Sequence, residues 1–61
     1  MTASELKRWL KSKGATFTDR KKHTAVQLGE KWTVMPRHAK QEIKAGTLKA
    51  ILRDLGLRME E

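Results

Sequence analysis

The sequence contains no cysteine and few acidic residues, and these shortages narrow the classes of protein it can encode. Without cysteine there is no disulfide framework, no thiol nucleophile and no thiolate zinc site, which suits the cytoplasm. No apolar run approaches the length that spans a membrane, and the first residues lack the apolar region of a signal peptide. We therefore expect a cytoplasmic protein with no membrane partner.

Basic residues are twice as numerous as acidic ones, with fourteen Lys and Arg against seven Asp and Glu and a formal net charge of +7. Such a charge favours phosphate backbones or another polyanion as partner. The length of 61 residues predicts a single domain over residues 1–61, close to the lower limit for folding without disulfides or metal. So short a chain has little room for an enclosed pocket, so we expect a polymer substrate on the surface and no small-molecule cofactor or metal.

The first segment has the pattern of an amphipathic helix. Thr2 and Glu5 have capping-box spacing at its start, and Gly14 is well placed to end it in a left-handed cap. The apolar stripe on its inner face consists of Leu6, Trp9 and Leu10.

The apolar period changes to two between residues 15 and 36, which predicts three antiparallel strands at about 15–19, 23–28 and 32–35. A three-residue loop over 29–31 would set their register and bury one group of side chains, namely Val26, Leu28, Trp32 and Val34. The opposite, more polar face would then carry His23, Ala25, Gln27, Thr33 and Met35. This interpretation leaves His23 in solvent.

A loop is expected from Arg37 to Ala45, after Pro36 ends the third strand, with Ile43 as an inward anchor. A second amphipathic helix should begin near Gly46 and Thr47 and stop at Gly56, with Leu57 folding back on its last turn. Its apolar face consists of Leu48, Ile51, Leu52 and Leu55. Two such helices bury their apolar faces best on one side of the sheet, which predicts an α+β fold, an α-β-β-β-α two-layer sandwich.

This order of elements is similar to the double-stranded RNA-binding domain fold, and the residues resemble the HicA toxin family specifically. Four segments carry the resemblance over nearly the whole chain, in the family's order and spacing. They are Ser4-Glu5-Leu6 with Gly14, the strand histidine His23, the segment Val34-Met35-Pro36-Arg37-His38, and the segment from Gly46 through Thr47, Leu48, Ile51 and Leu52 to Gly56. One departure is Lys21-Lys22, where the family often has a Gly-Ser pair.

The resemblance implies an mRNA interferase, a toxin that cleaves messenger RNA until a HicB-type antitoxin binds it. It also implies that His23 is the catalytic histidine. The Lys21-Lys22 departure leaves this histidine in register and adds positive charge where RNA would approach.

The chemistry of metal-independent RNA cleavage agrees with a histidine in this role. A base must take the proton of the 2′-hydroxyl and an acid must protonate the leaving 5′-oxygen, and histidine can do either near neutral pH. We expect Arg20, Lys21 and Lys22 to bind the phosphate beside His23. The residues alone leave open a simpler interpretation, in which His23 is a solvated strand residue.

Other residues have weaker interpretations. His38 is either a second proton-transfer or phosphate-binding group or an ordinary loop residue. Arg37 and Lys40 extend the expected basic rim for RNA, unless they belong to an ordinary solvated charge run. Trp9 and Trp32 could stack on bases, but both are expected in the core.

The alternative function is a non-catalytic double-stranded-RNA-binding module that uses shape and phosphate contacts only. A basic interaction protein without a nucleic-acid role is a third possibility. A two-metal nuclease is disfavoured because the carboxylates are scattered over different elements, at Asp19, Glu30, Glu42 and Asp54.

Overall fold

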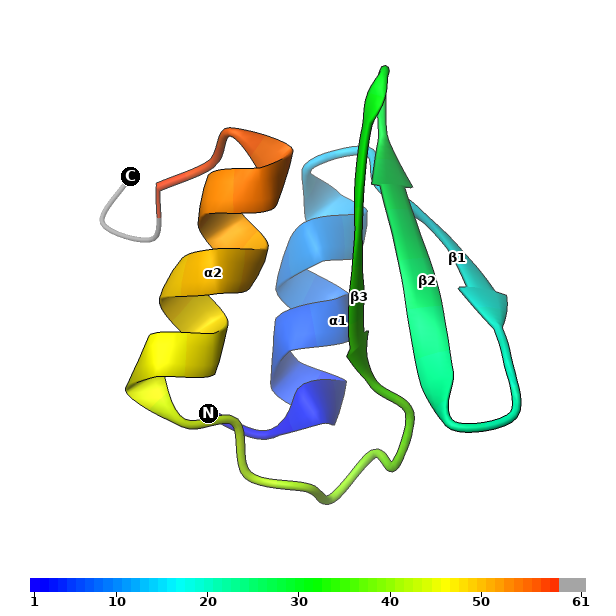
Figure 1. The fold of residues 1–61 in the computed structure, drawn as a ribbon, viewed down its shortest axis with the longest axis vertical. Coiled ribbons are helices and arrows are strands. Elements are labelled where there is room, and N and C mark those ends of the chain that lie inside the picture. The colour runs from blue at the N-terminus through cyan, green and yellow to red at the C-terminus, as the bar shows by residue number, and fades with distance from the viewer. Residues whose placement is uncertain (59–61) are drawn as a thin grey trace.

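Two helices and a three-stranded antiparallel sheet form the computed structural model, which describes residues 1–58. The elements are α1 (Ala3–Ser12), β1 (Thr16–Asp19), β2 (His23–Leu28), β3 (Lys31–Pro36) and α2 (Ala45–Leu55). Both helices lie on one face of the sheet and leave the other open (Figure 1). The α-β-β-β-α sandwich is confirmed, while residues 59–61 of the expected domain lie outside the described part. Within residues 1–58, no helix has the length and apolarity needed to cross a membrane.

Helix α1 forms as its sequence predicts. The backbone N–H of Glu5 donates to the Thr2 hydroxyl at 3.3 Å, and the N–H of Thr2 donates to the Glu5 carboxylate at 2.8 Å, which completes the capping box. At the other end, Gly14 has φ +95 and allows the N–H of Ala15 to reach the carbonyl of Leu10. The apolar stripe faces the sheet, with Leu6 and Leu10 fully buried and Trp9 partly buried against them.

The register between β2 and β3 differs by one residue from the expected one. Gly29 and Glu30 alone form the turn, so Leu28 pairs with Lys31 and Gln27 with Trp32. Because alternate residues face opposite sides of a sheet, this shift reverses the whole of β3. The expected burial of Trp32 and Val34 is wrong: both are exposed on the open face, whereas Thr33 and Met35 are buried under the helices.

The physical reason lies in the turn and in two hydrogen bonds. Gly29 has φ +64, which matches the glycine-first pattern of a two-residue type II′ hairpin. The two threonines that face the helices both have partners for their hydroxyl groups. Thr24 donates to Asp19 at 2.9 Å and Thr33 donates to Asp54 of α2 at 3.0 Å. The covered face thus accommodates polar residues that a hydrophobicity pattern assigns to solvent.

Helix α2 begins one or two residues earlier than expected, at Ala45, and ends as predicted at Gly56. Gly56 has φ +70, and the N–H of Leu57 returns to the carbonyl of Leu52 at 2.8 Å. The core between helices and sheet contains the buried apolar residues Ala3, Leu6, Leu10, Ala15, Val26, Met35, Ile43, Ile51 and Leu55.

The loop between β3 and α2 is held by the start of the chain. Ile43 is buried, as expected, and its N–H donates to the carbonyl of Met1 at 2.8 Å. The N–H groups of Ala3 and Ser4 donate to the carbonyls of Gln41 and Ala39. These bonds satisfy backbone donors at the first turn of α1, which has no earlier helical carbonyls to use. Figure 1 shows this loop, the β1–β2 loop and the N-terminal ends of both helices at one end of the molecule.

Candidate functional site

His23 opens β2 on the uncovered face of the sheet, at the end of the molecule where these loops meet. Its side chain is exposed, as the sequence predicts, and it pairs across the sheet with Pro36. Its carbonyl accepts a hydrogen bond of 2.7 Å from the N–H of Arg20, which closes the β1–β2 loop. The strand end and this loop bond therefore fix the position of His23 in the backbone.

A hollow of about 320 Å³ lies beside this histidine, and we name it the histidine hollow. Its lining residues are Lys22, His23, Val34, Met35, Pro36, Gln41 and Thr47. Thr47 belongs to the first turn of α2, whose N-cap Lys44 makes no side-chain capping bond. The hollow therefore brings an imidazole, an ammonium group and the positive end of a helix dipole into one place.

A second hollow, of about 390 Å³, adjoins the first, and we name it the loop hollow. Its lining residues are Lys21, Lys22, Arg37, His38 and Gln41. It shares Lys22 and Gln41 with the histidine hollow. Arg37 also donates from Nη1 to the carbonyl of Lys21 at 3.4 Å, which links the two loops that form the hollow. His38 thus lies in the neighbouring hollow and does not line the one at His23.

A groove of about 310 Å³ crosses the open face beyond His23, and we name it the open-face groove. Its lining residues are Thr16, Thr18, Arg20, Ala25, Val26, Gln27, Trp32 and Val34. Arg20 therefore lies on the open face rather than in either hollow. Lys40 is exposed in the β3–α2 loop and lines neither hollow nor the groove.

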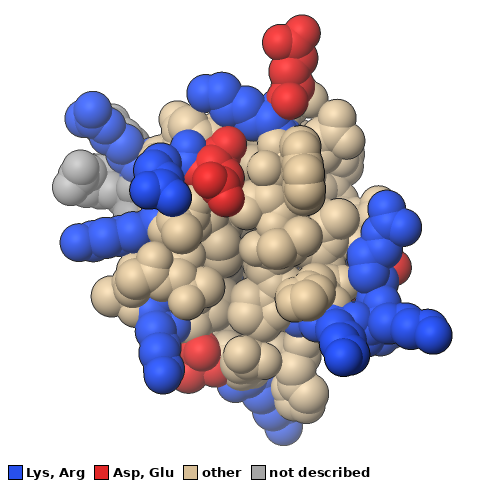
Figure 2. Space-filling view, viewed as in Figure 1, with Lys and Arg blue, Asp and Glu red and all other residues tan. Residues whose placement is uncertain are grey.

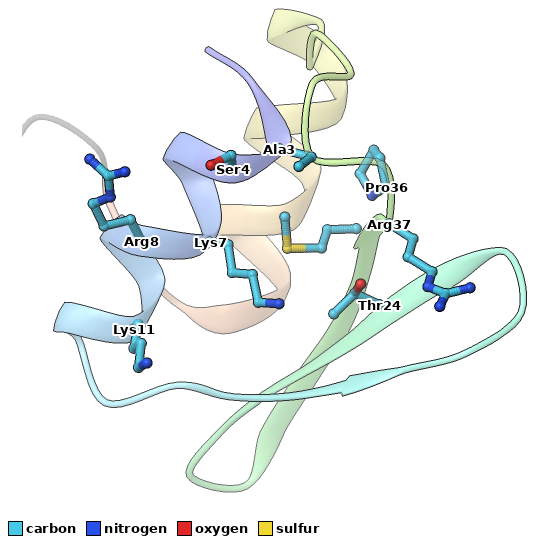
Figure 3. A pocket seen from close by; sticks show the side chains of 10 residues that line it. Ala3, Ser4, Lys7, Arg8, Lys11, Thr24, Pro36 and Arg37 are labelled. Carbon is cyan, nitrogen blue, oxygen red and sulfur yellow. The ribbon is translucent and has the colours of Figure 1, made fainter.

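A further hollow, of about 410 Å³, lies on the helix side of the sheet, where α1 passes β2 and β3. Lys7, Arg8 and Lys11 line it from α1, with Lys7 extending across it and Arg8 pointing away, and Arg37 lines it from the segment after β3 (Figure 3). Figure 2 likewise shows Lys and Arg side chains around the outline of the molecule rather than on one patch. Positive charge alone therefore does not locate the site, and the imidazole of His23 is what distinguishes its surroundings.

The sequence predicts a basic rim of Arg20, Lys21, Lys22, Arg37 and Lys40 around His23. Lys22 shares the histidine hollow, and Lys21 and Arg37 line the adjoining loop hollow. Arg20 and Lys40 lie outside both hollows. Sequence reasoning missed Gln41 and Thr47, because nothing in their local sequence indicates that the loop and α2 return to β2. Trp32, which the sequence predicts in the core, lies on the open face because the turn at Gly29 has two residues.

Known proteins match the chain over nearly its full length. The family model described as the HicA toxin of bacterial toxin-antitoxin matches residues 3–57. The chain belongs to the HicA toxin family. It is 45% identical to a probable mRNA interferase HicA 2 of Photorhabdus laumondii, over 95% of this chain and 100% of that protein. It is 42% identical to the probable mRNA interferase toxin HicA of Escherichia coli K12, over 93% of this chain and 98% of that protein.

A solved structure agrees with this membership. The crystal structure of the Escherichia coli HicAB toxin-antitoxin complex contains a chain that matches with a TM-score of 0.83 and 42% identity. The match covers 90% of this chain and 96% of that chain. The resemblance to HicA stated from the sequence is therefore confirmed, and so is the fold.

Proposed function

We propose that this HicA-family protein is an mRNA interferase, the toxin of a toxin–antitoxin pair, and that it cleaves RNA without metal through His23. The observation that carries the proposal is the histidine hollow, where an exposed imidazole adjoins Lys22 in a chain 45% identical to a probable mRNA interferase. The hollow is open and shallow, which suits a polymer laid across the surface.

The proposed reaction needs two proton transfers at one phosphate. His23 takes the proton of the 2′-hydroxyl as the 2′-oxygen attacks phosphorus, and the bond from phosphorus to the 5′-oxygen breaks as that oxygen gains a proton from water. The products are a 2′,3′-cyclic phosphate and a 5′-hydroxyl end. A general acid or base of this kind contributes about 10²- to 10⁴-fold to the rate.

Cations around His23 stabilise the substrate and the developing charge. Lys22 is the lysine that lines the histidine hollow, and it offsets charge on the phosphorane. Lys21, Arg37 and His38 line the loop hollow next to it and bind a flanking phosphate of the same strand. Arg20 is assigned to the open face, and Lys40 contributes only to the general positive field.

A HicB-type antitoxin inhibits the toxin by covering His23 and competing with RNA for the cations of the two hollows. The supporting finding is the match to a toxin chain solved in a toxin-antitoxin complex. Such a partner needs acidic groups at the contact, because the surface around His23 is rich in lysine and arginine.

The test of catalysis uses purified protein, a labelled messenger RNA fragment and a chelator. We expect the wild type to cut in the presence of EDTA and leave cyclic-phosphate ends, and His23→Ala to cut at least about 100-fold more slowly. The control variant is Lys49→Ala, because Lys49 is an exposed residue of α2 that lines neither the three hollows nor the open-face groove. A folded His23→Ala protein that cuts at the wild-type rate contradicts the assignment.

The same assay distinguishes RNA cleavage from the alternative function, which is RNA binding without cleavage. If the protein were a double-stranded-RNA-binding module, the wild type and His23→Ala would both bind duplex RNA and neither would produce new RNA ends.

For the antitoxin contact, we expect a Lys21→Glu, Lys22→Glu double variant to bind a purified HicB-type partner at least tenfold more weakly. Full retention of binding by this variant and by His23→Ala contradicts the proposed contact.

A further inference from the structure

Trp32 is the largest exposed apolar side chain of the described residues, with 67% of its surface accessible to solvent. Tryptophan is strongly buried on average in folded proteins, so an indole held open to water invites an explanation. It does not belong to a loose loop, because Trp32 is paired with Gln27 within the regular ladder between β2 and β3. The hydrogen-bonded sheet therefore fixes the backbone position of Trp32.

The open face consists of cross-strand rows, as the pairing of the strands shows. The first row is Thr16, Gln27 and Trp32, the second is Thr18, Ala25 and Val34, and the third contains His23 and Pro36. The middle row has the smaller side chains, and the open-face groove lies over it. The groove thus runs between the indole of Trp32 and the histidine end of the sheet. The outer rows are four residue steps apart along β2, from His23 to Gln27, or about 13 Å at the usual strand rise.

The groove combines three kinds of side chain that can bind a nucleotide. Trp32 and Val34 give an apolar wall, Gln27 and Thr18 supply polar groups, and Arg20 brings a positive charge to the same groove. Aromatic side chains on open sheet faces bind single-stranded RNA by stacking with splayed-out bases, while cations hold the phosphates. A purely apolar protein contact would not need the cation or the polar floor.

We propose that the open-face groove binds one unpaired nucleobase of the RNA substrate, stacked on the indole of Trp32, with Arg20 holding an adjoining phosphate. The proposal rests on the proposed function, since it describes how the RNA cut at His23 is held nearby. It predicts a preference for single-stranded RNA, because a base inside a duplex cannot reach the indole.

Tryptophan fluorescence tests this site without requiring cleavage. The protein carries His23→Ala to prevent cutting and Trp9→Phe to leave Trp32 as the remaining indole, since the chain has two tryptophans. We expect a short single-stranded RNA to quench the emission of Trp32. The same RNA with its bases removed, and its blunt duplex, should quench much less at equal phosphate concentration.

Binding measurements on further variants separate stacking from other roles. Trp32→Ala should weaken the binding of single-stranded RNA by about 5- to 150-fold, the range for loss of one stacked base. Trp32→Phe should restore most of this affinity and Trp32→Leu should not, because leucine is apolar but cannot stack. Trp9→Phe alone is the matched control and should change affinity by less than about twofold, since Trp9 is packed against the core.

Several results would overturn the base site. Unchanged RNA affinity in Trp32→Ala, or equal quenching by base-free RNA and duplex, means that Trp32 does not stack on a base. A Trp32 emission that shifts with protein concentration alone, while RNA has no effect, assigns the indole to a contact between two copies. Loss of affinity for an antitoxin but not for RNA assigns it to that partner.

The same experiments can reject the base site and the interferase function independently of each other. If wild-type protein cuts no RNA but its Trp32 is quenched by single strands, the interferase assignment fails and the base site stands. If wild-type protein cuts RNA and Trp32→Ala binds and cuts equally well, the base site fails and His23 stands.

Discussion

The two faces of the sheet come from alternate residues of the same three strands, and each face mixes polar with apolar side chains. The covered face holds Val26 and Met35 together with two threonines. The open face holds His23 and Gln27 together with a tryptophan and a valine. What distinguishes them is the environment of the polar atoms. Each buried threonine hydroxyl donates to a carboxylate away from water, whereas Thr16 and Gln27 on the open face donate to backbone carbonyls and stay exposed to solvent.

This difference teaches that composition alone does not identify the buried side of so small a sheet. A threonine can occupy the core when Asp19 or Asp54 accepts a hydrogen bond from its hydroxyl group. A tryptophan can be exposed when the turn length puts it there. Substitutions of neighbouring residues on opposite faces test this account directly.

The largest contrast is expected at the centre of β2. Val26→Asp should unfold the protein, because an unpaired charge would enter a fully buried position of a core that supplies only about 3–5 kcal/mol. Gln27→Asp introduces the same side chain one residue later on the open face and should leave the fold intact. Circular dichroism of both variants measures the difference. Two folded variants of similar stability would refute the assignment of faces.

The next contrast tests the register of β3. Met35→Ala should lower the free energy of unfolding by about 2–5 kcal/mol, because Met35 is 2% exposed and its loss leaves a cavity. Val34→Ala should lower it by less than about 1 kcal/mol, since Val34 is 44% exposed. Urea unfolding of the two variants decides the point. The opposite ranking would support the three-residue turn instead.

A smaller effect is expected where the covered face meets α2. Asp54→Ala removes the acceptor of the Thr33 hydroxyl and should lower the free energy of unfolding by about 1–3 kcal/mol, because a buried donor loses its partner. Adding Thr33→Val should recover much of this loss, since no unsatisfied hydroxyl then remains. A double variant no more stable than Asp54→Ala would show that the bond is not responsible.

The smallest expected effect is a pH dependence of stability that arises from Glu5 at the start of α1. Hydrogen bonds from the backbone and side chain of Thr2 hold the pKa of Glu5 below its ordinary value of 4.5. The folded state therefore favours the ionised carboxylate. This contribution to stability is present above the unfolded value and is lost as pH falls through the lowered folded value.

Glu5→Gln should lack this part of the acid sensitivity while keeping a capping side chain. Urea unfolding from about pH 6 to about pH 2 should show a smaller loss of stability in the variant than in the wild type. Identical pH profiles would mean that the capping box contributes nothing through the charge of Glu5.

Local signals predicted most of the fold. The capping box at Thr2 and Glu5 and the glycines at positions 14 and 56 mark the helix ends through backbone chemistry that depends only on nearby residues. The register of β3 could not be fixed in the same way, because a turn at Gly29 can contain two or three residues. The hydrogen bond between Thr33 and Asp54, 21 residues apart, is not visible in a local pattern.

The sequence predicts the exposed histidine at the centre of the candidate site but not the residues that surround it. His23 is exposed because it opens β2 on the side opposite Val26, and that alternation could be read from the sequence. Gln41 and Thr47 reach the histidine hollow because the β3–α2 loop is held by Met1 and Ala3, and such contacts depend on the finished fold. A three-residue loop at Gly29 predicts Trp32 in the core, and the two-residue turn places it on the open face instead.

The two-residue turn at Gly29 and Glu30 has a consequence for how proteins of this shape can diverge. Insertion of one codon there would exchange the two sides of β3, moving an indole into the protein interior and a threonine and a methionine into water. Such a change would alter the folded core and the RNA-facing surface at once. Natural selection should therefore conserve the length of this turn.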